Sequence, residues 1–443
     1  MTGPLLLGID VGSSRVKALL VDEHGTESGS AAVHTPFVET ADGVEAGAAD
    51  ILDAVVRAVT ELGDGRPRVA AVGVAGMAES GAPLDRAGRP LAPVIPWHDR
   101  RGGDVADRLD DRFGPDLARA AGQKVRSVAT VAKLGWLLDN GVTGVFRWLG
   151  VPELVLHALT GAQATEWSLA ARTGCFDVGR RRWLPEVAEA AGFDPTVFPE
   201  IRSGGEDMGR VSAEGAAWTG LPAGVPVTVA GHDHLSGVVG SGAGRDDLVN
   251  SVGTAETVVG RSADVPDVGA ALDRGVALTV FPRADGWAAL ASGARAGLAI
   301  AAAADALGRS PAELDELAAG TPGPPLDAPG LLDSLHRRDP PVLPDGPPGA
   351  VWRTLLDALA VCTAEAVEKV TGLLGDADRV VVFGGGAKSD PWVAAKAERV
   401  PVPVWRSTAG EAVARGAAAF AGMAAGWWPS PAAAPRPDLQ RFE

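Results

Sequence analysis

This sequence has few cysteines, no cluster of basic residues and no long apolar stretch, and each absence excludes a class of protein. Its two cysteines, Cys175 and Cys362, are too few for a disulfide framework and lack the spacing of a zinc site. No stretch of about 18 apolar residues occurs, and Asp10 interrupts the first apolar run, so the sequence predicts neither a membrane span nor a signal peptide. We therefore expect a protein of the reducing cytoplasm, with both cysteines acting as small buried apolar residues.

The charge balance and two missing motifs exclude further classes. The 443 residues include 40 Lys and Arg against 56 Asp and Glu, a net charge of −16, so nucleic acid and anionic membranes are not expected partners. The sequence holds no GxxxxGK(S/T) segment, and its GGGAKS segment lacks the GxGxxG spacing. A P-loop and a Rossmann dinucleotide site are therefore poorly supported. A chain of this length is more than one hydrophobic core usually serves, which predicts two domains.

The first half alternates between predicted strands and helices. Apolar runs at 5–10 and 16–22, joined by a Gly-Ser turn, predict a β-hairpin. A helix is predicted at 48–63 and a strand at 68–75, and the helical signal dominates from 104 to 200. Strands that alternate with helices predict an α/β fold with a mainly parallel sheet covered on both faces.

The second half opens in a similar way. A strand-turn-helix unit at 226–240 is followed by a second hairpin at 247–259, again with a polar, Gly-containing turn. Two such openings about 240 residues apart suggest two related halves, and we predict domains at 1–243 and 244–443. Further predictions are helices at 290–308 and 350–375, a strand from 379, a Pro- and Gly-rich loop at 320–349 and a surface tail after 428.

The first hairpin has the residue types of a phosphate-binding turn. Gly12 allows close approach of the backbone, Ser13 and Ser14 offer hydroxyl donors, and Lys17 offers a positive charge. Asp10 at the strand end would hold a hydrated Mg²⁺ against the phosphates, because this ion prefers a carboxylate together with several waters. The alternative is an ordinary hairpin with an aspartate in its turn.

The second strand-turn-helix unit places Asp233 at the carboxyl end of a strand, where α/β folds bind their ligands. A carboxylate there could accept the proton of a substrate hydroxyl that attacks phosphorus. His232 and His234 flank it, and the alternatives are a metal site or a histidine base. Because adjacent strand residues point to opposite faces, we expect the three side chains not to share one ligand and the histidines to be structural.

Three glycines, 384–386, follow the strand predicted from 379. Without side chains they would let a flat adenine ring lie against the backbone. The alternative is a tight strand-to-helix turn.

Together these segments resemble the FGGY carbohydrate kinases, a branch of the superfamily of actin, heat-shock chaperones and hexokinase. The resemblance covers residues 5 to about 425, and its specificity comes from five motifs in the right order and at the right intervals. The motifs are GIDVGSSRVK, IPWHDRR, GLPAGVPVTVAGHDH, NSVGTAET and VVFGGGAKSDPW.

The resemblance implies two ribonuclease-H-like domains that flank an interdomain cleft, where the γ-phosphoryl group of ATP passes to a sugar hydroxyl. It implies that Asp233 is the general base, that Asp10 lies at the Mg²⁺ and that dimers are common, although the sequence leaves the oligomeric state open. The positions it assigns to the nucleotide are Gly12, Ser13, Ser14, Lys17, Gly253, Thr254, Gly297, Gly385, Gly386 and Ala387.

For the sugar or polyol, the resemblance implies contacts from Ala78, Glu79, Trp97 and Asp99, besides the base. The alternatives are core packing for Trp97 and a structural salt bridge for Asp99 and Arg100. Xylulokinases typically carry Met-His-Gly where this chain has Met-Ala-Glu, so the resemblance does not identify the sugar. Arg15 also replaces a small hydroxyl residue of the family's first loop.

Two other functions remain open at this point. One is a non-catalytic sensor of sugars or nucleotides, although a sensor needs neither Asp10 nor Asp233. The other is an ATPase driven by a protein partner, which the WHDRR and GMAES segments disfavour.

Overall fold

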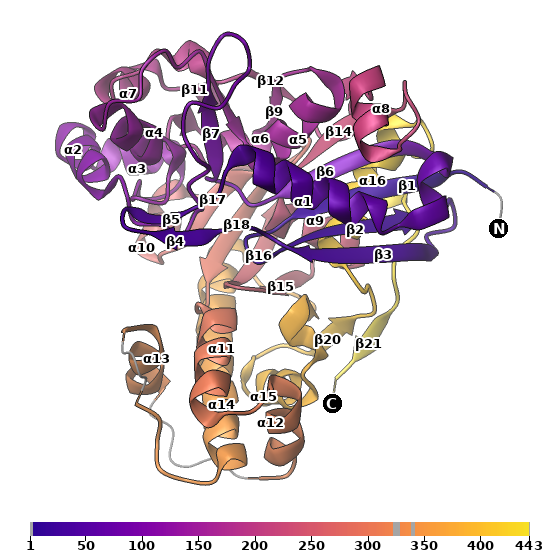
Figure 1. Ribbon diagram of the computed structural model, residues 1–443. Helices are drawn as coiled ribbons and strands as arrows, with labels where there is room; N and C mark the ends of the chain where they lie inside the picture. Colours follow the sequence, from indigo (N-terminus) through magenta and orange to yellow (C-terminus); the bar gives the residue numbers. More distant parts are fainter. Residues whose placement is uncertain (1–2, 322–327, 338–341, 443) are drawn as a thin grey trace.

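The computed structural model describes residues 3–321, 328–337 and 342–442, and its two halves are each built on one mixed sheet (Figure 1). The N-terminal sheet has the order β13-β14-β6-β1-β2-β3, and the C-terminal sheet has the order β17-β18-β16-β15-β19-β20-β21. The N-terminal strands are β1 Leu5–Val11, β2 Arg15–Val21, β3 Glu27–His34, β6 Val69–Gly76, β13 Gly209–Arg210 and β14 Pro226–His232. The C-terminal strands are β15 Leu248–Val252, β16 Glu256–Ser262, β17 Ala277–Val280, β18 Trp287–Ser292, β19 Val380–Phe383, β20 Val404–Ser407 and β21 Leu439–Arg441.

The two sheets share one topology. β1 pairs antiparallel with β2 and parallel with β6, and in the same way β15 pairs antiparallel with β16 and parallel with β19. This correspondence agrees with the prediction of two related halves. The prediction of a mainly parallel sheet is wrong, because the hairpins add antiparallel strands to both sheets.

Strand β1 explains the apolar run that opens the sequence. All seven of its residues are buried. Helix α1 (Ala48–Thr60) packs on β2 and β3, and helix α16 (Ala412–Ala424) packs on β1 and β6. A strand covered on both faces needs apolar residues on both faces, which is why the run does not alternate.

Helix α16 lies on the sheet of the N-terminal half although it comes from the end of the chain (Figure 1). It crosses α9 (Asp233–Gly240) at two glycines. A Cβ on Gly240 would lie 1.9 Å from the carbonyl oxygen of Ala412, and a Cβ on Gly416 would lie 1.8 Å from that of Ser236. The two backbones touch here. A boundary at residue 243 therefore assigns the two sheets to different domains, although α9 and α16, which lie on opposite sides of that boundary in the chain, remain packed together.

Helices dominate the region between β6 and β14, as predicted, together with short two-stranded sheets. The helices there are α2 Gly103–Phe113, α3 Pro115–Ala121, α4 Thr130–Asp139, α5 Val151–Thr160, α6 Trp167–Ala170, α7 Pro185–Ala190 and α8 Ala213–Thr219. The short strands of the N-terminal half are β4 Val38–Thr40, β5 Gly43–Glu45, β7 Gly81–Leu84, β8 Arg147–Gly150, β9 Ala164–Glu166, β10 Phe176–Asp177, β11 Arg182–Trp183 and β12 Glu200–Arg202.

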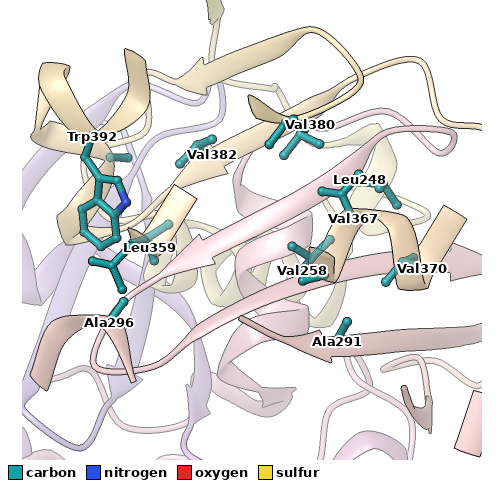
Figure 2. Packing of buried hydrophobic residues seen from close by; sticks show 14 of the residues in the cluster. Leu248, Val258, Ala291, Ala296, Leu359, Val367, Val370, Val380, Val382 and Trp392 are labelled. Carbon is teal, nitrogen blue, oxygen red and sulfur yellow. The ribbon is translucent and has the colours of Figure 1, made fainter. Parts of the chain in front are cut away.

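The C-terminal sheet is covered by a long helix, α14 (Pro348–Leu374), which packs on β16 and β18. Figure 2 shows this core, where strand side chains such as Val258 and Val382 lie opposite Leu359 and Val367 of the helix. The other helices of this half are α10 Val268–Asp273, α11 Ala296–Leu307, α12 Pro311–Ala318, α13 Ala328–Arg337 and α15 Asp390–Arg399.

Three predictions in this half need correction. The helix predicted at 290–308 begins at Ala296, because residues 290–292 belong to β18. The loop predicted at 320–349 contains α13, while its residues 322–327 and 338–341 lie outside the described part of the chain. The tail after 428 is at the surface, but its β21 also extends the C-terminal sheet beside β20. No helix among the described residues is long and apolar enough to cross a membrane.

Candidate active site

The two hairpin turns meet at the junction of the halves. The hydroxyls of Ser14 and Thr254 lie 2.9 Å apart, and Ser13 donates to Thr254 across 3.4 Å. The amide of Gly12 closes the first turn by donating to the carbonyl of Arg15, and the amide of Gly253 donates to Ala255 in the second. Residues about 240 positions apart thus offer hydroxyl groups at one place, as the two predicted phosphate turns require.

Gly297 packs against the second turn at the start of α11. Its amide donates to the carbonyl of Thr254 over 3.1 Å. A Cβ at this position would lie 2.6 Å from the carbonyl oxygen of Gly253, so a larger residue would displace the turn. Gly297, which the resemblance places beside the nucleotide, therefore contacts the second turn directly.

The Gly-rich segment forms a 3-10 turn, η3 (Gly385–Lys388), next to the same region. A Cβ on Gly386 would meet the ring of Trp392 and the side chain of Val252, the last residue before the second turn. Gly385 faces open space, and the side chain of Ala387 is buried. The segment is thus a tight strand-to-helix turn in which Gly385 presents an open backbone surface.

Asp10 lies at the end of β1, opposite Lys17 of β2 in the strand register. The ammonium of Lys17 forms a 2.6 Å ion pair with Glu411, the residue that precedes α16. Burial lowers the pKa of Lys17, but Asp10 and Glu411 more than offset this, so the pKa is raised overall. Lys17 is therefore positively charged, and its partner is a carboxylate that the sequence did not single out.

The Asp10 carboxylate is buried and incompletely satisfied. Its Oδ1 atom has no hydrogen-bond partner among the described residues. Burial raises the pKa of Asp10 to about 7; Lys17 lowers it, and the nearby carboxylates of Asp233 and Glu411 raise it further. An unpartnered carboxylate oxygen close to two more carboxylates is a donor set that suits a hard divalent cation such as Mg²⁺.

Asp233 is the first residue of α9, immediately after β14. Its Oδ1 atom accepts from the amide of His234 over 2.7 Å and lies 3.1 Å from Nε2 of His232. Its Oδ2 atom accepts no hydrogen bond from the described residues, and a quarter of the side chain is exposed. Burial raises the pKa of Asp233 to about 7; the His234 amide lowers it, and Glu79 raises it.

The expectation that His232, Asp233 and His234 point apart is wrong. One ligand atom from each lies within 4.8 Å of the others, because the chain turns from strand into helix at Asp233. The ring of His234 is held between the hydroxyls of Ser251 and Thr257, 3.0 and 3.4 Å away. Burial lowers the pKa of both imidazoles, that of His234 to about 4, so both are neutral at pH 7. The anchoring of His234 fits the predicted structural role.

A buried pair supports the turn that carries Asp233. Glu166 accepts from the amide of Ser168 over 2.9 Å, and the Ser168 hydroxyl accepts from the backbone amide of His232 over 2.9 Å. Burial raises the pKa of Glu166 to about 8. These contacts fix the end of β14 and thereby the direction of the Asp233 side chain.

Glu79 lies next to this site in a strained turn after β6. Its φ of 63° is left-handed, which is uncommon for a residue other than glycine and is often found at functional sites. Arg172 pairs with its carboxylate over 2.7 Å, and the buried Lys133 donates to its carbonyl over 2.8 Å. The carboxylate raises the pKa of Asp233, so the two acidic groups belong to one site.

The other predicted sugar contacts differ in their environment. Asp99 is buried, and its two oxygens accept from Arg101 and from the amide of Val44 over 2.7–3.0 Å. This is the structural salt bridge that was considered as an alternative, with Arg101 in place of the exposed Arg100. Trp97 is partly buried against the N-terminal core.

Ala78 is buried and lines a small cavity together with Glu79. The volume of this cavity is about 20 Å³, room for little more than a water molecule. It is therefore too small to hold a sugar.

Sequence reasoning missed the residues that support the site: Lys133, Glu166, Ser168, Arg172 and Glu411. All but Glu411 lie in the predominantly helical region. In the sequence they cannot be told apart from ordinary polar residues on the exposed faces of helices. The only usable signal was a charged residue within an apolar segment, as for Lys133 between Ala132 and Leu134.

Comparison with known proteins gives a consistent family. The model of the N-terminal domain of the FGGY family of carbohydrate kinases matches residues 5–240, and the model of its C-terminal domain matches residues 290–425. An L-fuculokinase from Escherichia coli K12 is 29% identical over 279 residues, which are 60% of this chain and 58% of that protein. The chain thus matches less than two thirds of the length of that relative.

Other relatives match over nearly their whole length. A xylulose kinase from Streptomyces coelicolor is 28% identical over 95% of this chain and 88% of that protein. The structure of a xylulose kinase from Lactobacillus acidophilus superposes with a TM-score of 0.83 over 99% of this chain and 93% of that chain, at 17% identity. At that identity the superposition establishes the fold, which is the predicted pair of actin-like domains.

Proposed function

Because this chain belongs to the FGGY family of carbohydrate kinases, we propose that it transfers the γ-phosphoryl group of ATP to a hydroxyl group of a sugar or sugar alcohol. The observation that carries the proposal is the position of Asp233. Its unbonded Oδ2 atom belongs to a site that also includes Asp10, at the junction where the two phosphate turns meet.

Asp233 is the proposed general base. With a pKa of about 7 it is substantially ionised at neutral pH and can still take up a proton, as a base near its optimum should. Because Oδ1 is held by the His234 amide, Oδ2 is the atom that would accept the proton of the attacking hydroxyl.

The two turns are the proposed phosphate site. The hydroxyls of Ser13 and Ser14 each bond to that of Thr254, and all three would donate to phosphate oxygens once the halves separate to admit ATP. Asp10 would hold a Mg²⁺, with Glu411 nearby, and the bound ion would neutralise charge on the transferred group. The open backbone at Gly385 is the proposed adenosine surface.

Glu79 is the proposed sugar contact. Arg172 fixes one oxygen of its carboxylate and compensates its charge, so the other oxygen can accept a hydrogen bond from a hydroxyl group without favouring a charged substrate. An uncharged polyol or ketose, such as a pentulose, fits this site. Both oxygens of Asp99 already accept hydrogen bonds from the protein, so Asp99 would support the sugar site together with Trp97 rather than bind the sugar through its carboxylate.

The test is to incubate the protein with Mg-ATP and a panel of ketoses, aldoses and sugar alcohols, and to follow ADP release. We expect one sugar to stimulate release, the stimulation to rise with pH across about 7, and Asp233→Ala to lose it while still binding ATP. Asp104→Ala, which removes an exposed carboxylate of α2, is the matched control. If no sugar stimulates release, or if Asp233→Ala keeps it, a sensor or a partner-driven ATPase becomes the better explanation.

A further inference from the structure

A second pocket lies at the crossing of α9 and α16. Its volume is about 220 Å³, and it is lined by residues from both sheets, both crossing helices and the Pro-rich tail. Val21 comes from the N-terminal sheet, Arg261 from the C-terminal sheet, Val239 from α9, Arg415 from α16 and Arg436 from the tail. We name it the arginine pocket. Because it touches every part that meets at the crossing, a ligand bound there would contact both halves at once.

Three arginines line this pocket, and among the described residues one of them forms an ion pair. Arg415 pairs with Glu27 over 3.2 Å. Among the described residues, the buried Nε of Arg261 has no hydrogen-bond partner, and the guanidinium donates only through a terminal nitrogen to the carbonyl of Gly244. Arg436 forms no ion pair within the described part of the chain. Asp285 is the one carboxylate in the lining.

The arginine pocket is rich in positive charge, although the protein as a whole is negatively charged. Burial lowers the pKa of Arg261, and the neighbouring cations Arg436 and Arg245 lower it further, whereas the carboxylates of Asp247 and Asp285 raise it. The lining holds three arginines against one carboxylate, an excess of positive charge in a protein whose net charge is −16. This arrangement therefore calls for an anionic ligand.

The remaining lining restricts the size and shape of that ligand. Phe281, Trp428 and Pro437 provide apolar walls beside the guanidinium groups. The volume lies below the range of about 300–1,000 Å³ typical of sites for drug-sized ligands. A phosphate monoester of a short carbon chain matches this combination, because guanidinium groups bind phosphate oxygens in pairs and the carbon chain can lie on the apolar walls.

We propose that the arginine pocket binds a small phosphate monoester and that its occupation favours one angle between the two halves. The binding stands independently of the proposed kinase activity, whereas the effect on turnover rests on it. A sugar phosphate, the class of product that a carbohydrate kinase releases, would act here as a feedback ligand.

Calorimetric titration with ribose 5-phosphate and, separately, inorganic phosphate tests the binding. We expect saturable binding by the full chain, an affinity at least about tenfold lower in Arg436→Glu, and unchanged affinity in Arg441→Glu, which reverses an exposed charge of the same tail outside the pocket. Lys17→Met separates this site from the active site and should leave the affinity unchanged. Arg436→Gln repeats the test with a milder change, and thermal melting confirms that each variant is folded.

Three results would overturn the proposal: no saturation up to about 10 mM ligand, equal loss in Arg441→Glu, or loss in Lys17→Met with none in Arg436→Glu. A second arm measures the KM for ATP with and without ribose 5-phosphate. A shift in wild type that Arg436→Glu abolishes supports the coupling, and binding without any shift refutes it. If the protein shows no kinase activity, the titration alone still decides whether the site exists.

Discussion

Each half of the molecule holds a buried glutamate paired with a cation, and the two pairs differ in what surrounds them. Glu79 faces Arg172 in the N-terminal half, and 13% of the arginine side chain is exposed. Glu256 faces Lys396 in the C-terminal half, where 1% or less of either side chain is exposed. One pair can be reached from outside, and the other is sealed.

The neighbours of each pair follow this difference. Glu79 is electrostatically linked to Asp233 and His234, so its charge acts on the proposed site of proton transfer. Lys396 instead donates to Asn250 and Thr363, and Thr363 donates to Glu256 over 2.6 Å. The sealed pair therefore joins β15, β16, α14 and α15, and Glu256 is the first residue of β16 after the second hairpin turn. The comparison teaches that the same residue types lie at the proposed sugar site in one half and hold secondary-structure elements together in the other.

The largest expected effect tests the site around the accessible pair of Glu79 and Arg172. Asp233→Asn should reduce kcat by about 10²–10⁴-fold, because the base is lost while the amide keeps the size of the side chain. Steady-state kinetics on the best sugar of the panel measures it, with Asp104→Asn as the control. A variant that keeps a third or more of wild-type kcat would show that Asp233 is not the general base, and the influence of Glu79 on Asp233 would then have no role in catalysis.

The next effect tests the sealed side. Lys396→Met should lower the free energy of unfolding by about 3–5 kcal/mol, because it leaves the Glu256 carboxylate buried without its cation. Urea unfolding measures this loss, and the double variant Lys396→Met/Glu256→Gln should recover most of it. Arg172→Met should lose clearly less, because Glu79 is less completely enclosed. Equal losses in the two single variants would break the distinction between the pairs.

A smaller expected effect distinguishes the binding of the sugar from the binding of ATP. Glu79→Gln should raise the KM for the sugar by about 10–100-fold, which corresponds to the loss of a hydrogen bond to a charged group. The KM for ATP should change by less than about twofold, since Glu79 is remote from the nucleotide residues in this assignment. Glu39→Gln, at an exposed position of β4, is the control. Matching changes in both KM values would contradict a specific sugar contact.

The smallest effect concerns pH. The folded pKa of Asp10 is raised above its unfolded value, so folded Asp10 retains its proton up to about pH 7, and its contribution to stability falls as the pH rises from about 4 to 7. Asp10→Asn removes this dependence. It should therefore stabilise the protein by about 2 kcal/mol more at pH 8 than at pH 5, as measured by urea unfolding at both values. An equal effect at the two pH values would mean that burial does not raise the pKa of Asp10.

The fold was largely predictable because its strongest signals are local. The apolar runs of β1 and β15, each followed by a polar Gly turn, identified two similar hairpins, and the structure shows the same topology in both halves. The prediction of parallel sheets failed because hydrophobicity does not report strand direction. Helix α13 was missed because prolines and glycines around it outweighed a short amphipathic segment.

The site was predictable only in part. Asp10 and Asp233 stand out because a carboxylate at the end of an apolar strand is expensive to bury without a function, whereas Glu79 was singled out only by the resemblance to the family. Their supporting residues did not stand out, since Arg172 lies 93 positions from Glu79 and Glu411 lies about 390 positions from Lys17. No pattern within a single segment indicates a contact over such separations.

The sequence by itself determined the family, the order of the elements and the carboxylates that carry the proposed chemistry, because these depend on residue types at short spacing. Only the tertiary structure decided which cation faces which carboxylate, that α16 returns to the N-terminal sheet, and that three arginines gather at the crossing of α9 and α16. The physical reason is that burial and the distances between charges arise only when distant segments pack together, and these quantities set both the pKa values and the access of ligands.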